Sequence, residues 1–334
     1  MKTLRGILAT LKNKAEQGKA IVSLPKYQAL KLSLLRATTN DPLAPPDPKD
    51  ITIFLSFGQG PRAAASVAIH ALVDRLCSTD SASVSVKCLV LVHHIFRHGS
   101  FVLVDQLSNN PSSGGRNCLK LSNFRDDSSS LCWDLSSWIR WYARYLEHEV
   151  CTCKMLEPFT CLSGQEVGIV GEEERITTLT NIHLIKEMEY LVGLVEEMCL
   201  MPQSLLKGNI LVEHIMGMVS EDAMVCMNAM AIRVKEFDYR IECLSYSDSL
   251  EVLSVLKRLG GCYHGMVSLF PKTEKDRMWV MSNDLSEKVG MHEELKGEGK
   301  CRKGRSHSLR VSKRLLRCDD SFLFSSCRYE GELF

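Results

Sequence analysis

The chain has 334 residues, of which 45% are hydrophobic and 24% are charged, so it can bury a large core and form one to three domains. Its formal net charge of +1 conceals two basic ends. Residues 1–36 carry eight basic residues and one acidic residue, and residues 300–317 carry eight basic residues and no acidic one. Such ends attract anionic lipid or nucleic acid, and charge alone does not choose between the two.

Hydrophobic runs in this sequence are short. The longest, Cys88–Phe96, is interrupted by His93 and His94, so we predict no transmembrane helix. The N-terminal residues do not form the continuous apolar core of a secretory signal, because they are interrupted by Lys2, Arg5, Lys12 and Lys14. We therefore expect a protein on the cytosolic side of membranes.

The 14 cysteines are scattered and contain no Cys-x-x-Cys pair. Cys151 and Cys153 are separated by one residue, which fits no standard zinc site. In a chain without a secretory signal, cysteines usually act as small, reduced hydrophobic residues. We expect neither a metal nor a cofactor.

Helical periodicity dominates the sequence, and no alternating strand pattern is convincing. The predicted helices cover residues 3–17, 24–37, 50–57, 61–77, 82–98, 100–107, 133–155, 178–199, 206–218, 220–243 and 247–268. Proline and glycine separate several of them, as at Pro42, Pro48 and Gly99. Short connections between amphipathic helices predict an all-α superhelix rather than a bundle of a few helices.

The helix predicted at 133–155 is unusually aromatic. Its apolar side chains recur at spacings of three, four and seven, which predicts a stripe facing other helices: Trp133, Trp138, Ile139, Trp141, Tyr142, Tyr145 and Leu146. We expect this helix to start near Trp133, with Asp134 in its first turn. Arg140 and Arg144 should lie on the opposite side.

Two internal stretches lack a helical pattern. Ser108–Gly115 is rich in glycine and serine, and Ser163–Glu174 is weakly patterned, so we expect loops there and take the second as the best internal boundary. Beyond Phe270 the pattern breaks into short charged pieces, and we expect a mobile basic tail over 287–334.

Three segments in the same order resemble the ENTH/ANTH family of clathrin-assembly proteins, in particular its plant ANTH branch. They are Arg36–Pro42, then Val86–Ser108 with its Lys-x-Leu-x-Leu-x-His pattern, then the Leu-Ser-Asn-Phe-Arg-Asp loop and aromatic helix that follow Leu119. The resemblance implies a right-handed α-α superhelix with longer C-terminal helices. It divides the chain into a basic amphipathic segment over 1–19, an ENTH-like solenoid over 20–160 and an ANTH extension over 175–270.

The resemblance also implies a phosphoinositide site at the end of the second helix and the start of the next. The family places a basic residue, a histidine and a second basic residue there, and this chain has Arg36, Asn40 and Lys49. Asn40 replaces the histidine, and Asp50 brings a carboxylate that repels phosphate. The specific pocket is therefore altered, although both cations remain.

Two interpretations of the lipid contact stay open. Either a looser polybasic contact to anionic membrane is supplied by Lys12, Lys14, Lys19, Lys26 and Lys31, or inositide recognition is lost and the protein relies on protein partners. These lysines could also form an ordinary solvated face. The helix at 3–17 is amphipathic and could lie in the headgroup region or pack in the core.

The other motifs in the sequence do not indicate a catalytic site. His94 and His98 are spaced i, i+4, but no carboxylate or cysteine shares their turn, so we expect no metal there. The sequence has no phosphate loop, Gly-x-Ser-x-Gly or His-Glu-x-x-His motif. We therefore expect no enzyme.

A methionine-rich stretch and the tail bear on partners. The methionines could line a groove for a SNARE helix, as the resemblance implies, or fill the core: Met216, Met218, Met224, Met227 and Met230. The tail lacks Asp-Pro-Phe and Asn-Pro-Phe, and only Leu315–Asp319 loosely resembles a clathrin box.

The sequence thus predicts a peripheral adaptor that binds phosphoinositide or anionic lipid and promotes clathrin assembly at coated pits and vesicles, on the plasma membrane or Golgi. Its expected partners are the membrane, clathrin heavy chain with its adaptor, and a SNARE helix, without nucleic acid. The alternative is a helical scaffold that binds proteins or RNA without specific lipid recognition, which affinity for RNA above that for anionic liposomes would favour.

Overall fold

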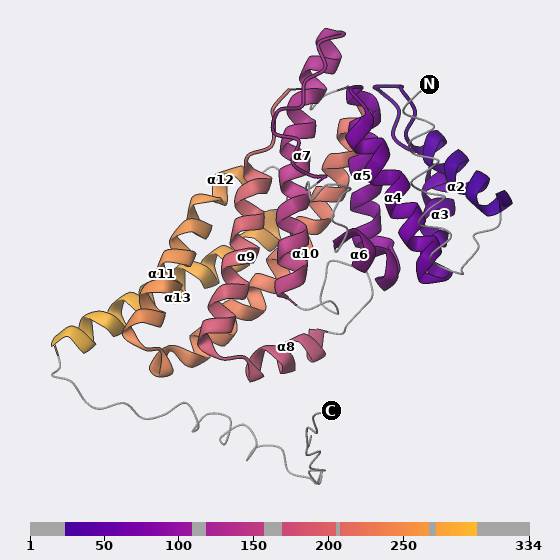
Figure 1. Ribbon diagram of the computed structural model, residues 1–334. Helices are drawn as coiled ribbons and strands as arrows, with labels where there is room; N and C mark the ends of the chain where they lie inside the picture. The colour runs from indigo at the N-terminus through magenta and orange to yellow at the C-terminus, as the bar shows by residue number, and fades with distance from the viewer. Residues whose placement is uncertain (1–23, 109–117, 157–168, 205–207, 267–271, 299–334) are drawn as a thin grey trace, which may run out of the picture.

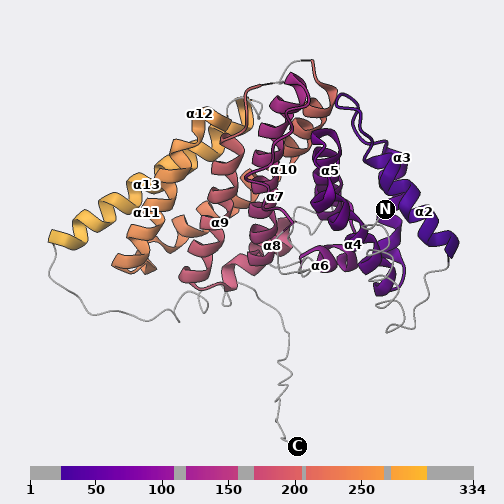
Figure 2. The same ribbon diagram turned by 45° about the horizontal axis from the view of Figure 1, so that its top comes forward.

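The computed structural model describes residues 24–108, 118–156, 169–204, 208–266 and 272–298. Every regular element in these ranges is a helix, so the all-α prediction is confirmed. The helices form an elongated body from α2 to α13, in which α10 returns to lie beside α5 and α7 (Figure 1). α2 (Leu24–Ala37) and α3 (Pro48–Ser56) form one edge, and α11 (Tyr246–Gly261) and α13 (Lys272–Glu298) form the other, as Figure 2 shows from a second direction. The predicted helix at 3–17 lies outside the described residues.

The N-terminal helices match the sequence pattern closely. α4 (Arg62–Ser78), α5 (Ala82–His98) and α6 (Phe101–Ser108) follow α3 and a short 3-10 turn. α5 is buried on almost every side and is the central helix of this half. It ends at Gly99, where a Cβ atom would lie 2.3 Å from the carbonyl oxygen of Ile95. Only glycine permits that close approach of the chain.

The aromatic helix α7 (Ser130–Met155) packs against α5, and its stripe from Leu135 to Leu146 is buried. Two details of the prediction were wrong. The helix begins three residues before Trp133, because the side chain of Ser129 accepts a hydrogen bond from the N–H of Cys132 and caps it. Trp133 lies outside the stripe with 52% of its surface exposed, beside the guanidinium of Arg125.

The C-terminal half departs more from the prediction. α9 (Asn181–Cys199) is close to its expected range, but the predicted helices 206–218 and 220–243 are one helix, α10 (Ile210–Arg240), followed by a 3-10 turn. Gly217 lies inside α10 with no atom near the position of a Cβ, so it does not break the helix. The predicted helix 247–268 is α11 and the short α12 (Tyr263–Met266).

Two helices lie where none was expected. α8 (Ile169–Thr178) begins inside the predicted loop 163–174. α13 occupies the region beyond Phe270 and continues to Glu298, so the predicted start of the tail at 287 is wrong. Both helices are held by tertiary contacts: Glu172 of α8 pairs with Arg233, and Trp279 and Leu285 of α13 are buried.

A single core crosses the predicted internal boundary. The indole of Trp141 on α7 donates to the carbonyl of Glu197 on α9 at 2.8 Å, and the indole of Trp138 donates to the carbonyl of Ser204 at 2.8 Å. Buried apolar residues form one cluster from Leu30 to Val289. The C-terminal helices therefore extend the first half rather than form a separate core.

A buried polar network joins α5, α7 and α10. Asp222 of α10 accepts from the hydroxyl of Tyr145 at 2.6 Å, and its carboxylate lies 2.5 Å from Nε2 of His93 and 3.2 Å from Nε of Arg97. Nδ1 of His93 lies 2.7 Å from the hydroxyl of Tyr142. Burial raises the pKa of Asp222, whereas His93, Tyr145 and Arg97 lower it, and the pKa lies below its ordinary value. The carboxylate is therefore ionised and paired.

Arginines of α10 fix α8 and α9. The side chain of Arg233 is fully buried and pairs with Glu187 of α9 at 2.6 Å and with Glu172 of α8 at 2.9 Å. Arg240 donates to the carbonyl of Leu179 at 2.7 Å and to that of Ile176 at 3.1 Å, which satisfies carbonyl groups at the C-terminal end of α8.

A window within Ile210–Cys243 is long and apolar enough, by length and composition, to cross a membrane, which the sequence prediction overlooked. Core helices pass the same test. Asp222 and Arg233 lie buried and ion-paired with other helices of this chain, which identifies α10 as a core helix here.

We predict that Asp222→Ala lowers the free energy of unfolding by about 3–5 kcal/mol, because it leaves His93 and the hydroxyl of Tyr145 without their buried partner and removes one of the two carboxylates that pair with Arg97. Asp238→Ala, on the same helix, removes an exposed pair with Lys288 and should cost less than about 1 kcal/mol. Urea denaturation measures both. Equal losses in the two variants would contradict a special role for the buried network.

A second prediction concerns acid. Burial raises the pKa of Glu187, but hydrogen bonds and charge from Arg175 and Arg233 lower it below its usual value of 4.5. The stability contributed by this carboxylate is therefore complete above about pH 4.5 and is lost as the pH falls through the lower pKa of the folded state. Glu187→Gln should flatten the dependence of unfolding free energy on pH in that range, measured by denaturation at a series of pH values. Glu189→Gln, exposed on the same helix, should leave the slope nearly unchanged.

Candidate functional site

The connection from α2 to α3 is fixed at its start by cations from two other helices. The guanidinium of Arg75 on α4 donates to the carbonyl of Thr38 at 2.8 Å, and the ammonium of Lys87 on α5 donates to the hydroxyl of Thr39 at 2.7 Å. Thr38 also donates its hydroxyl to the carbonyl of Leu34 at 2.6 Å. The end of α2 is therefore held in one place relative to α4 and α5.

Asn40 lies in this connection but is tied to the start of α5. Its side-chain oxygen accepts from the hydroxyl of Ser81 at 2.5 Å. Ser81 is the residue that precedes the first turn of α5. The side chain that replaces the family histidine thus serves to hold the connection to α5.

The start of α3 presents the second predicted cation. Asp47 accepts from the N–H of Lys49 at 2.8 Å and caps the helix, and Pro48 occupies the first helical position. Lys49 is exposed, whereas Asp50 is half-buried. This arrangement leaves the Lys49 ammonium at the surface.

Cations on this edge have no acidic partners. Lys31, Arg36 and Lys49 are exposed, and none of them forms an ion pair with the part of the chain that the structure describes. α2 contains no aspartate or glutamate. Lys26 lies on α2, although its side chain is not described, and Lys12, Lys14 and Lys19 lie outside the described residues. α2 therefore brings two exposed cations near α3, which adds a third.

Carboxylates of the connection are engaged with its own backbone. Asp41 accepts from the N–H of Leu43 at 2.9 Å, and this hydrogen bond helps to lower the pKa of Asp41. Lys87 also favours the ionised form of Asp41, although burial lowers the pKa of Lys87 itself. Asp41, Asp47 and Asp50 thus keep negative charge close to the candidate site.

A hollow of about 310 Å³ lies beside Asn40. Its lining includes Ser81 and the carboxylates of Asp80 and Asp126. Asp126 accepts from the N–H of Ala82 at 2.7 Å and so caps α5. Because two carboxylates face this hollow, it does not suit a phosphate group, and the candidate lipid contact is the outer surface of α2 and α3.

Sequence reasoning missed a second group of ionisable residues. Donor atoms of His93, Glu149 and Asp222 lie within 4.8 Å of one another, although the three residues come from different helices. The distances suit a metal ion, but Arg97 already brings positive charge to Asp222. We interpret the group as part of the buried network that joins the helices.

His94 and His98, considered above as a metal pair, lie in a row with His214 of α10. The ring centres of His94 and His98 are 5.9 Å apart, and those of His94 and His214 are 5.8 Å apart. Burial, together with the neighbouring imidazoles and Arg97, lowers the pKa of His94 to about 3. His94 is therefore neutral near pH 7.

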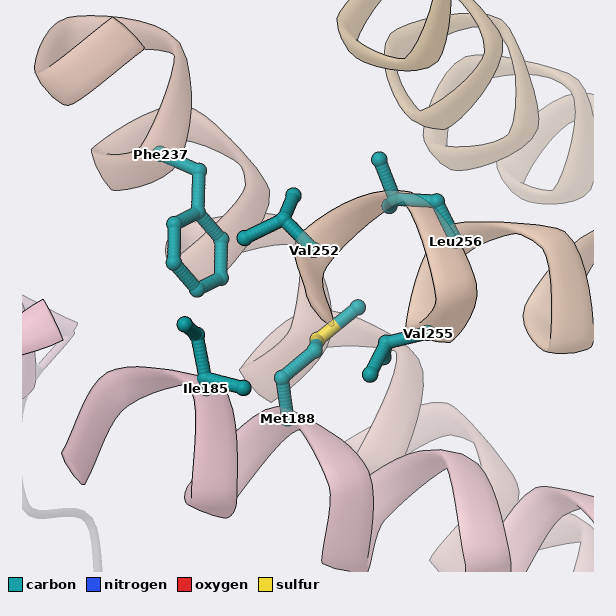
Figure 3. A pocket seen from close by; sticks show the side chains of 6 residues that line it. All are labelled: Ile185, Met188, Phe237, Val252, Val255 and Leu256. Atoms are coloured by element: carbon teal, nitrogen blue, oxygen red, sulfur yellow. The ribbon is translucent and has the colours of Figure 1, made fainter. Parts of the chain in front are cut away.

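The methionine stretch contributes mainly to the core. Met218, Met227 and Met230 are buried, Met216 packs against the core, and Met224 is 40% exposed. A small apolar crevice nearby lies between α9, α10 and α11 (Figure 3). Figure 3 shows side chains such as Met188, Phe237 and Val252 pointing toward one another across it. The crevice is too narrow to admit water and is a packing gap.

Comparison with protein-family models matches residues 29–227 to the ANTH domain. The matched region starts in α2, includes Arg36, Asn40 and Lys49, and ends within α10.

Three proteins of Arabidopsis thaliana extend this finding. One with the provisional name clathrin assembly protein is 42% identical over 261 residues, which cover 77% of this chain and 72% of that protein. A second with the same provisional name is 30% identical over 236 residues, covering 69% of this chain and 67% of the relative. The clathrin coat assembly protein AP180 is 31% identical over 121 residues, which are 36% of this chain and 18% of that protein.

Proposed function

Because this chain belongs to the ANTH-domain family and its similarity to the provisionally named clathrin assembly proteins spans most of its length, we propose that it is a non-enzymatic peripheral membrane adaptor. It binds phosphoinositide or anionic lipid on the cytoplasmic face of membranes and promotes clathrin assembly during endocytosis and vesicle budding. The sites of action are coated pits and vesicles, on the plasma membrane or Golgi.

The observation that carries the lipid contact is the group of exposed cations without acidic partners on α2 and α3. A basic residue near an anionic membrane contributes about 1 kcal/mol of binding free energy. Arg36 and Lys49 form the core of the proposed contact, with support from Lys12, Lys14, Lys26 and Lys31. The positions of Lys31, Arg36 and Lys49 on a fixed helical edge favour a surface contact over a deep pocket.

Selectivity for phosphoinositides is expected to be modest. The side chain of Asn40 is bound to Ser81, and Asp41, Asp47 and Asp50 place carboxylates nearby. A multiply phosphorylated headgroup meets more repulsion here than in a pocket lined by cations alone. We therefore propose that attraction between these cations and an anionic membrane contributes most of the binding free energy.

Partners follow from the family and from the names of its members. Clathrin heavy chain with its adaptor is the proposed coat partner, and residues Leu315–Asp319, which lie outside the described residues, are the proposed contact. The resemblance also implies a SNARE helix. Because Met218, Met227 and Met230 are buried, we do not place that helix on the methionine stretch.

The second candidate function is a helical scaffold that binds proteins or RNA without specific lipid recognition. The carboxylates around Arg36 and Lys49 favour its protein-binding form, because they weaken any contact with phosphate, including the phosphates of RNA. RNA and anionic lipid compete for the same positive charge, so direct comparison of the two ligands separates the candidates.

We predict that Arg36→Ala with Lys49→Ala weakens vesicle binding by about 30-fold, equivalent to about 2 kcal/mol for the two charges. Sedimentation with vesicles containing phosphatidylinositol 4,5-bisphosphate, compared with phosphatidylserine vesicles of equal charge, measures this. Lys186→Ala with Lys257→Ala removes two exposed lysines from α9 and α11 and should change binding little.

Each outcome of this experiment separates the candidates. Selective inositide binding that the double variant loses would show that the altered site still reads the headgroup. Equal binding to both vesicles, lowered by the double variant, supports attraction by charge. Absence of binding by the wild type, together with tight RNA binding, would support the scaffold instead.

We also predict that Leu315→Ala with Leu316→Ala lowers recovery of purified clathrin in a pull-down by about tenfold or more, because paired leucines of short motifs contribute mainly by burial in a groove. Leu309→Ala with Val311→Ala removes apolar side chains from the same basic stretch and should leave recovery close to wild type. Undiminished recovery with both variants would place the clathrin contact elsewhere in the chain.

A further inference from the structure

The outer face of α2 carries leucines that the fold does not bury. Leu30 and Leu34 are 1% and 4% exposed and belong to the core, whereas Leu32 and Leu35 are 48% and 42% exposed. Residues three apart lie on the same side of a helix, so Leu32 and Leu35 form one exposed apolar pair. A globular chain does not need this pair for its core.

Cations border the leucine pair on both sides. With 3.6 residues per turn, Lys31 lies about 40° to one side of Leu35, and Arg36 lies about 40° beyond Leu32 on the other side. Each cation is also four residues from one of the leucines, so an apolar and a basic side chain are neighbours along the helix in both cases.

The adjoining connection and α3 repeat the pattern. Leu43 is 48% exposed in the connection, and Ile53 on α3 is 44% exposed, four residues after Lys49. The side chain of Asp41 accepts a hydrogen bond from the backbone N–H of Leu43, which fixes the turn in which Leu43 is exposed. Exposed apolar and basic side chains thus occur in the connection and on α3 as well, beside the carboxylates of Asp41, Asp47 and Asp50.

The charged residues of the α2–α3 edge indicate which kind of partner covers this surface. Residues 1–19 of the same chain are a possible cover, but they carry Lys2, Arg5, Lys12, Lys14 and Lys19 against Glu16 alone. Lys31 and Arg36, which flank the leucine pair on the acid-free helix α2, repel such a basic segment. An anionic bilayer offers phosphates to the cations and hydrocarbon to the leucines, and basic side chains can reach outward to headgroups while apolar ones enter the acyl region.

We propose that the α2–α3 edge is an insertion surface for anionic membranes. Leu32 and Leu35, assisted by Leu43 and Ile53, enter the boundary between headgroups and acyl chains, and Lys31, Arg36 and Lys49 bind the headgroup phosphates. This inference rests on the proposed membrane binding and adds an apolar component that high salt does not remove, since salt screens charges and not burial.

The test uses the full chain and vesicles of phosphatidylcholine with phosphatidylserine, at low and at high salt. Leu32→Ser with Leu35→Ser should weaken binding by about tenfold at both salt concentrations. The matched control is Ile182→Ser with Leu250→Ser, since these residues are 58% and 48% exposed and lie on α9 and α11, away from the α2–α3 edge (Figure 1). This control should bind as the wild type does.

Insertion also has a spectroscopic signature. In Leu35→Trp, lipids with brominated acyl chains should quench tryptophan fluorescence beyond the quenching seen for wild type. Leu250→Trp, on α11, should show no added quenching. Binding of Leu35→Trp without added quenching would show that the helix stays above the acyl region and would overturn the proposal.

Three results distinguish this proposal from the function on which it rests. If Leu32→Ser with Leu35→Ser binds like wild type while Arg36→Ala with Lys49→Ala does not, insertion is wrong and attraction by charge stands. If the wild type binds no vesicles, the membrane function itself fails. If the serine variant unfolds at lower urea concentration than wild type in the absence of vesicles, the leucines pack against this chain, which also overturns insertion.

Discussion

The charged side chains of α10 are the constraint on which the arrangement of the other helices depends. A buried ion without a partner costs several kcal/mol. Glu236 and Arg240 pair within α10, whereas Asp222 and Arg233 require other helices to bring their counterparts. Asp222 contacts side chains of α5 and α7, and Arg233 forms ion pairs with α8 and α9. Arg240 donates hydrogen bonds at the carbonyl end of α8. Apolar packing alone tolerates sliding between helices, whereas these pairs are satisfied in one register. α10 therefore sets how the two halves of the chain meet.

At the candidate membrane-binding edge, too, charged side chains fix the position of a helix. Arg75 and Lys87 direct their charges inward to Thr38 and Thr39, and these bonds fix where α2 ends. Arg36 and Lys49, by contrast, are exposed and form no ion pair with the residues that the structure describes. The cations of this region thus fall into two groups. Arg75 and Lys87 stabilise the fold, whereas the exposed Arg36 and Lys49 remain available for a ligand.

Helices whose limits are marked by nearby residues were predicted accurately from the sequence, whereas helices stabilised by residues distant in sequence were not. α2 and α5 were predicted to the residue, because proline, glycine and a clear apolar pattern mark their limits. α8 and α13 were missed because they are polar and owe their helical state to partners distant in sequence, such as Arg233 for Glu172. At the site, Arg36 and Lys49 could be named from the pattern, but the bond between Asn40 and Ser81 could not. The four leucines from Leu30 to Leu35 fit a core helix equally well in any rotation, so only the packing of α4 and α5 tells which two face outward.

The order of the helices across the body has a mechanical consequence. α2 lies at one edge, and the last turn of α13 lies at the opposite edge (Figure 1). With the proposed α2–α3 edge resting on a bilayer, the last described turn of α13 would lie on the side of the body farthest from the lipid. The helical body would then act as a spacer, and its length would set how far above the membrane α13 ends.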